Sequence, residues 1–72
     1  MAFRGQYDGN GNIIYKAYAR PGAEESALVW QVCLITYSGD NPVSITWPQN
    51  QFGAATSEFN YSWADRASYT YS

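Results

Sequence analysis

Hydrophobic and polar residues alternate with a period of two along several short stretches of this chain. The clearest examples are residues 43–47 (VSITW) and 59–63 (FNYSW). Because successive side chains of a strand point to opposite faces, this period predicts half-buried β-strands. The same pattern predicts a last strand over 67–71, with residues 64–66 as the connection that leads into it.

A longer stretch from Leu28 to Tyr37 is mostly apolar and rich in β-branched residues. This composition is typical of a central strand that is covered on both faces. The preceding residues 22–27 tolerate a helix but are too few to form a stable one, so they predict a loop or a single turn. Residues 49–56 are polar and predict a second loop.

Two groups of turn-forming residues punctuate the apolar stretches. Asp-Gly and Asn-Gly pairs supply the positive φ angles that tight hairpin turns need, so the chain is expected to reverse near residues 8–12. The returning strand would run over 13–20 and end at the Pro-Gly pair that follows. Thirty residues later, residues 37–41 repeat the Tyr-x-Gly design of residues 7–11. The predicted structural turn residues are Asp8, Gly9, Asn10, Gly11, Gly39 and Asp40.

Five or six strands without a convincing amphipathic helix predict an all-β domain spanning residues 1–72, built from two related hairpins. The pattern leaves open a small sandwich, a barrel or a twisted meander of mostly antiparallel strands. Isolated hairpins are marginal in water, so the two hairpins are expected to share one core. The expected core residues are Trp30, Val32, Leu34, Val43, Ile45, Trp47, Phe59 and Trp63.

Length and cysteine content limit how such a domain is stabilised. A chain of 72 residues buries only about 60% of its unfolded surface and is marginal alone. Cys33 is the only cysteine and there is no histidine, so neither a disulfide within the chain nor a Cys/His metal site is available. We expect Cys33 to be a buried structural thiol, and oligomerisation or docking to supply further stability.

Charge and hydropathy exclude several classes of partner. The net charge is −2, only 14% of residues are charged, and the four basic residues are scattered. Nucleic acid is therefore not an expected partner. No apolar stretch reaches the length of a membrane span and no signal peptide is recognised, which predicts a soluble, unsecreted protein without a membrane partner.

Catalytic and metal-binding patterns are missing from the sequence. Without histidine, neither a Ser-His-Asp nor a Cys-His arrangement can form. Glu24 and Glu25 are adjacent in a polar loop and are interpreted as a solvated pair. The first turn lacks the acidic residue that ends a calcium loop. We therefore predict no enzyme activity, no cofactor and no metal. Asp65 and Arg66 are candidates for a structural ion pair and are expected to hold the C-terminus by a salt bridge or by hydrogen bonds.

Aromatic residues make up 18% of the chain and include seven tyrosines. Tyrosine gives a large contact area at low entropic cost, so these side chains either cap a small core or line a contact surface. The last predicted strand has no lysine or proline to protect it, and we expect the first strand or a neighbouring subunit to cover it. The candidate protein-interface residues are Tyr18, Tyr61, Tyr69 and Tyr71.

Motifs along nearly the whole chain carry a family resemblance. They are Tyr7-Asp8-Gly9-Asn10 with Ile14-Tyr15, Ala19-Arg20-Pro21-Gly22, Trp30-Gln31-Val32 leading to Ile35-Thr36-Tyr37-Ser38-Gly39, and Trp63-Ala64-Asp65-Arg66-Ala67 with Tyr69. In these motifs the chain resembles small virion-associated structural proteins of tailed bacteriophages and prophages.

The resemblance implies a non-enzymatic structural or adaptor subunit of a virion, at the head, neck, tail or baseplate, assembled in the host cytoplasm. Its implied partners are other virion proteins, bound as a homo-oligomer or on a larger assembly. The alternatives are a small carbohydrate- or peptide-binding β module, in which exposed Trp47, Tyr61 or Trp63 stacks on a ligand, and a host-directed phage regulator.

Overall fold

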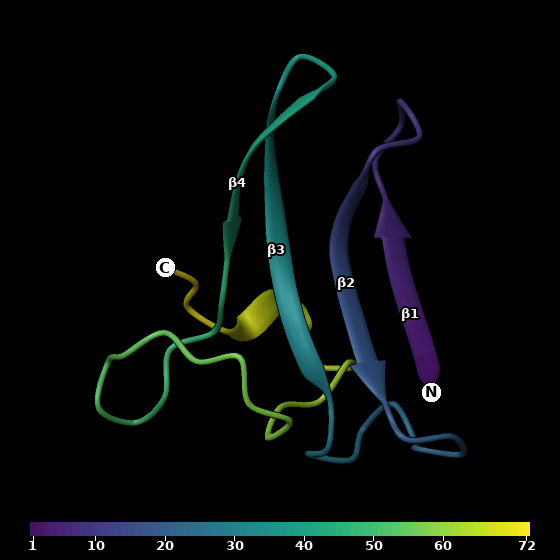
Figure 1. Cartoon of the computed structure of the whole chain (residues 1–72), viewed down its shortest axis with the longest axis vertical. Coiled ribbons are helices and arrows are strands. Elements are labelled where there is room, and N and C mark those ends of the chain that lie inside the picture. Colours follow the sequence, from purple (N-terminus) through teal and green to yellow (C-terminus); the bar gives the residue numbers. More distant parts are fainter.

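The computed structural model describes all 72 residues and contains one antiparallel sheet of four strands (Figure 1). The strands follow one another in space as they do in the chain: β1 (Ala2–Tyr7), β2 (Ile13–Ala19), β3 (Gln31–Ser38) and β4 (Asn41–Thr46). The only helical element is a 3₁₀ turn, η1 (Arg66–Ser68). The all-β prediction is confirmed, with one open four-stranded meander in place of a sandwich or barrel of five to six strands.

Both hairpin turns lie at the same end of the sheet (Figure 1). In the first, the Asp8 carboxylate accepts hydrogen bonds from the backbone N–H groups of Asn10 and Asn12, at 2.8 and 3.0 Å. In the second, Gly39 has a φ of 63°, a left-handed backbone conformation that is sterically unfavourable for residues with a Cβ. The Asn12 side chain donates to Asp40 at 3.0 Å and so links the two turns. That the hairpins are related by repetition stays a prediction.

The core lies on one face of the sheet. Its buried members come from β2, β3 and the C-terminal part of the chain: Ala17, Ala19, Trp30, Val32, Tyr61 and Trp63. The two alanines are fully buried, and their small side chains leave room on β2 for the indole rings. Three of the expected core residues, Trp30, Val32 and Trp63, are confirmed in this role.

Three other expected core residues are wrong. Val43 is 61% exposed, Ile45 53% and Phe59 45%. The first two belong to β4, the edge strand of the sheet, and Phe59 lies in an irregular loop. Trp47 and Leu34 are only half-buried. The alternating pattern correctly predicts a strand at β4, but periodicity alone does not reveal whether other residues cover the apolar side of that strand.

The two predicted C-terminal strands are also wrong. Residues 59–63 contribute a single bridge between Tyr61 and Trp30, and residues 67–71 contribute one between Tyr71 and Pro48. Side chains take the place of ladder partners here: the Tyr69 hydroxyl accepts from the backbone N–H of Ser62 at 2.8 Å. Such side-chain bonds to the backbone compete with regular strand pairing.

The connection between β2 and β3 packs beneath the sheet because polar atoms hold it there. The Trp30 indole Nε1 donates to the Glu24 carbonyl at 2.8 Å, and the backbone N–H of Ala64 donates to the Glu25 carbonyl at 2.9 Å. Arg4 on β1 forms an ion pair with Glu25 at 2.8 Å. Residues 20–30 are thereby tied to both β1 and the C-terminal segment. No helix in the structure is long and apolar enough to cross a membrane.

Candidate binding surfaces

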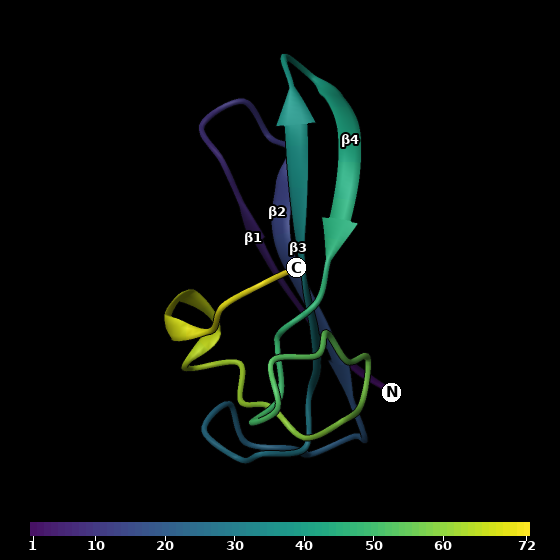
Figure 2. The same ribbon diagram turned by 90° about the vertical axis from the view of Figure 1, so that its left-hand side faces the viewer.

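One face of the sheet is covered only in part. Near the start of β3 the Gln31 side chain donates to the Ser57 carbonyl at 2.8 Å, so the 49–60 loop reaches this face there. In Figure 2, η1 lies on one side of the strands, residues 20–30 pass beneath their lower end, and the hairpin ends extend beyond the covering loops. Ala17 and Val32 pair with one another on the covered side, so the residues that alternate with them point the other way. We call this partly covered surface the open face; the strand register assigns to it Phe3, Tyr7, Ile13, Lys16, Tyr18, Gln31, Cys33, Ile35 and Ile45. Of these, Cys33 and Ile35 are buried, whereas Phe3, Tyr7 and Ile45 are exposed.

The open face is apolar and almost free of charge. Phe3 is 43% exposed, and its ring lies 5.4 Å from the ring of Tyr18 between centroids. Ile45 is paired with Ile35 on the neighbouring strand. Of the ten charged residues in the chain, only Lys16 lies on this face. Depletion of charge together with enrichment in aromatic residues is the compositional signature of a protein interface.

Cys33 lies at the centre of the open face beside Lys16, its register partner on β2. Its side chain is 2% exposed. Burial raises the pKa of the thiol, and the positive charge of Lys16 only partly opposes this. Because the thiolate is the reactive form, Cys33 is an inert packing residue at neutral pH. The expectation of a buried structural thiol is confirmed.

Three of the four candidate interface tyrosines lie on the opposite side, where they hold the chain's C-terminal part against the sheet. Tyr61 is only 8% exposed. A chain of ring contacts links it through Tyr69 and Tyr71 to Tyr15 on β2, with centroid distances of 5.1, 6.5 and 5.8 Å. Tyr18 alone belongs to the open face.

The C-terminus is covered by its own chain. Trp47 and Ser72 exchange two backbone hydrogen bonds, at 3.1 and 3.0 Å, and Gln49 donates to the Thr70 carbonyl at 2.8 Å. The expected cover by the first strand is therefore wrong, because residues 47–49 continue beyond β4 and supply the partner. A contact with a neighbouring subunit stays a prediction. This arrangement removes the exposed edge that the sequence suggested.

Asp65 and Arg66 do not pair with each other. The Asp65 carboxylate accepts from the Ser62 hydroxyl at 2.7 Å. Arg66 donates to the Gln6 side chain at 2.8 Å and lies over the Trp63 ring, 4.2 Å from its centroid. The predicted ion pair is thus replaced by two separate anchors, one within the C-terminal segment and one to β1.

Burial also changes the acidity of two tyrosines in this region. Desolvation raises the pKa of the Tyr61 phenol, and the negative charge of Glu58 raises it further. The pKa of Tyr71 is raised mainly by desolvation, and its hydroxyl donates to the Arg66 carbonyl at 2.7 Å. Both phenols therefore stay neutral as hydrogen-bond donors well into alkaline solution.

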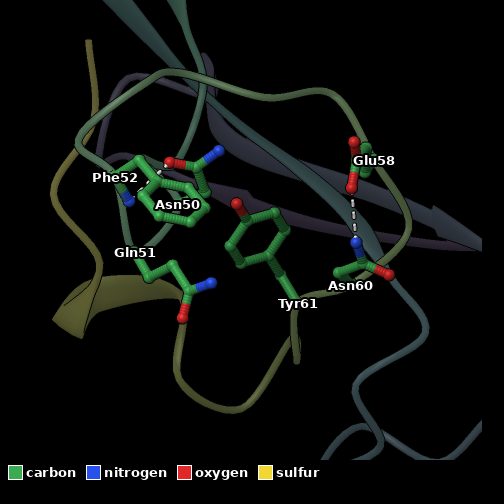
Figure 3. A pocket seen from close by; sticks show the side chains of 6 residues that line it. All are labelled: Asn50, Gln51, Phe52, Glu58, Asn60 and Tyr61. Atoms are coloured by element: carbon green, nitrogen blue, oxygen red, sulfur yellow. Dashed lines mark hydrogen bonds between the residues drawn. The ribbon is translucent and has the colours of Figure 1, made fainter.

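A second candidate surface is a hollow of about 480 Å³ beside the C-terminal segment (Figure 3). We call it the amide pocket; its lining residues are Asn50, Gln51, Phe52, Glu58, Asn60 and Tyr61. Of these, sequence reasoning named only Tyr61. Three amides lie close together only after the 49–60 loop has folded, and residues 50 and 60 are too far apart in sequence for a local motif.

The structure brings no group of three or more His, Cys, Asp or Glu side chains into an arrangement that could hold a metal ion. The chain matches no protein-family model, no curated protein and no solved structure.

Proposed function

We propose that this chain is a non-enzymatic structural or adaptor subunit of a tailed-phage virion, and that it docks on neighbouring subunits through the open face. The observation that carries the proposal is a largely apolar sheet face with one charged residue, on which Phe3, Tyr7 and Ile45 are exposed. The resemblance of the sequence motifs to virion-associated proteins is the reason for proposing a virion as the assembly.

The small core supports docking as the purpose of this face. Only 10 of 72 residues are buried, and a domain of this size is marginally stable alone. A partner that covers Phe3, Tyr18 and Ile45 would remove apolar surface from water, which stabilises by about 25 cal/mol for each Å². Docking would thus cover the apolar side chains that β1 and β4 leave exposed on this face.

The charge distribution also favours contact with copies of the chain or with other weakly charged subunits. Lys16 is the single charge on the open face, whereas the acidic residues lie in turns and in the segments outside it. Like charges brought together across an interface are destabilising, so a face with one lysine meets a second copy with little repulsion.

Lys16 offers a direct experimental test because it is the only lysine in the chain. Particles from the phage or prophage that carries the gene would be purified, treated with an amine-reactive cross-linker and analysed by mass spectrometry. We expect the chain in the particles at a fixed ratio to the major capsid protein, with Lys16 linked to a neighbouring subunit. Lys16→Arg is the matched control, which keeps the charge and removes the reactive amine.

Two results would contradict the proposal. One is a chain that is abundant in the infected cell but absent from purified particles. The other is a chain present in particles whose Lys16 carries only dead-end cross-linker, coupled to Lys16 at one end and hydrolysed at the other, which would place the open face in solvent.

The carbohydrate- or peptide-binding alternative loses two of its three proposed contacts. Trp63 is 6% exposed and Tyr61 is 8% exposed, so neither presents a ring face to a ligand. What favours a ligand is instead the amide pocket, in which Phe52 is 82% exposed.

A further inference from the structure

We infer that the amide pocket is a binding site for a neutral saccharide. This inference goes beyond the proposed assembly role and uses a different surface. The pocket combines fixed amide groups, one carboxylate and an exposed aromatic ring, all contributed by residues 50–61 (Figure 3).

One wall of the pocket presents a hydrogen-bond donor in a fixed orientation. The Asn50 side-chain oxygen accepts from the backbone N–H groups of Phe52 and Ala54, at 2.9 and 3.2 Å. These bonds determine which end of the amide is oxygen and which is nitrogen. Figure 3 shows the Asn50 nitrogen directed away from the backbone atoms that its oxygen binds. The amide hydrogens are therefore free to donate to a ligand.

The opposite wall presents an acceptor. The Asn60 side-chain nitrogen donates to the Glu58 carboxylate at 2.6 Å, which fixes both groups relative to each other. The second Glu58 oxygen remains available as an acceptor, whereas Figure 3 shows the Asn60 oxygen directed away from Asn50 and Phe52. A sugar hydroxyl both donates and accepts, so a ring with several hydroxyls matches a site that offers a donor on one side and an acceptor on the other.

The apolar part of the site is the Phe52 ring. It is 82% exposed and contributes nothing to the core. The C–H groups on one side of a pyranose ring form an apolar surface that packs on an aromatic ring, whose face is negative and whose contact area is large. Tyr61 closes the base of the pocket, and the volume of about 480 Å³ lies within the range of small-molecule sites.

The lining also excludes other classes of ligand. It contains no Lys or Arg to neutralise an anion, and Glu58 would repel one. Protein sites for divalent cations usually contain several carboxylates, and this pocket offers only one. A neutral, hydroxyl-rich ligand is the class that uses the amides and the exposed ring together.

The test is an NMR titration of the ¹⁵N-labelled chain with a panel of neutral oligosaccharides, including maltohexaose and chitohexaose. The side-chain NH₂ signals of Asn50, Gln51 and Asn60 report directly on the pocket. We expect at least one oligosaccharide to shift these signals, and we expect Phe52→Ala to weaken that binding by about tenfold. Leu28→Ala, which shortens a 64% exposed side chain outside the pocket, is the matched control and should bind like the unmodified chain.

Both Phe52→Ala and Gln51→Ala remove exposed groups without core contacts, so their spectra should retain the dispersion of the folded chain. The inference is overturned if no neutral oligosaccharide shifts the pocket signals at about 10 mM. It is likewise overturned if only tetra-alanine or calcium chloride shifts them, or if neither variant weakens binding. An Ile45→Lys variant should bind the saccharide normally, which separates this outcome from that of the assembly proposal.

Discussion

Ser62 shows how one small polar side chain fixes the C-terminal segment on the sheet. It is fully buried. Its hydroxyl donates to the Asp65 carboxylate at 2.7 Å and accepts from the Asp65 backbone N–H at 3.2 Å. The Tyr69 hydroxyl lies 3.3 Å away. Ser62 lies between two aromatic residues in the sequence, where an alternating strand pattern places a polar, solvent-facing residue. For this reason its burial could not be predicted from the sequence.

Replacing Ser62 by alanine tests this network. We expect Ser62→Ala to lower the free energy of unfolding by about 1–3 kcal/mol, because the buried partners of the hydroxyl lose a hydrogen bond. Urea denaturation measures the change. Ser44→Ala is the control: this serine is exposed on β4 and should shift the free energy by no more than about 0.5 kcal/mol. Equal midpoints for the two variants would show that the network is not structural.

The buried phenols predict a loss of stability at high pH. The pKa values of Tyr61 and Tyr71 are raised above the ordinary value of 10.0. Above that pH the unfolded chain releases protons that the folded chain retains, so stability falls as the pH rises towards the raised values. The slope is at most about 1.4 kcal/mol per pH unit for each group. Below pH 10 these phenols are neutral in both states and contribute no slope.

Tyr71→Phe separates the hydrogen bond made by the Tyr71 hydroxyl from the effect of its ionisation on stability at high pH. The variant should be less stable at neutral pH by about 1 kcal/mol, because the bond to the Arg66 carbonyl is lost. It should also lose less stability above pH 10 than the unmodified chain. Urea midpoints measured across the alkaline range check both effects. Parallel curves for the two proteins would contradict the assignment of the slope to Tyr71.

At the scale of elements, the sequence predicted best what is determined locally. The β1–β2 and β3–β4 hairpins were predictable because Asp8, Gly11 and Gly39 stabilise their turns through short-range geometry. The C-terminal segment was not predictable in the same way. Its alternation of aromatic and polar residues is satisfied by packing against β2 and β3, which are distant in sequence, and no strand partner is available to it.

The first turn offers two glycines for a matched comparison. Gly11 has a φ of 84°, whereas Gly9 has no positive φ and open space where a Cβ would lie. We expect Gly11→Ala to destabilise by about 1–2 kcal/mol through backbone strain. Gly9→Ala should be neutral or slightly stabilising, because it restricts only the unfolded chain. Thermal unfolding distinguishes the two. A larger loss for Gly9→Ala would contradict the turn geometry.

At the scale of the whole molecule, the fold is one sheet whose main core and cover lie on one side (Figure 2). The sequence predicted aromatic contact surfaces but assigned them to the C-terminal tyrosines. Those residues instead attach the cover, and the uncovered apolar residues are those of β1, β2 and β4. Whether an apolar residue such as Ile45 faces a core or a partner depends on whether other segments of the chain pack over that face of the sheet. The alternating pattern of a single strand does not reveal this.

The amide pocket is lined by residues 50–52, 58, 60 and 61, none of which belongs to the open face. The fold therefore separates a flat apolar surface suited to a neighbouring subunit from a polar hollow suited to a small ligand. Substitutions on one surface should leave the other intact.

Incorporation of two lysine variants into particles tests the docking role of the open face most directly. Ile45→Lys places a charge on the face, whereas Leu28→Lys places one at a site that is also exposed but lies outside it. Both should fold, as circular dichroism would confirm. We predict that Ile45→Lys is depleted from purified particles by about tenfold or more, since a buried unpaired charge opposes docking, while Leu28→Lys is incorporated normally. Equal incorporation of the two variants, measured by quantitative mass spectrometry, would contradict the account.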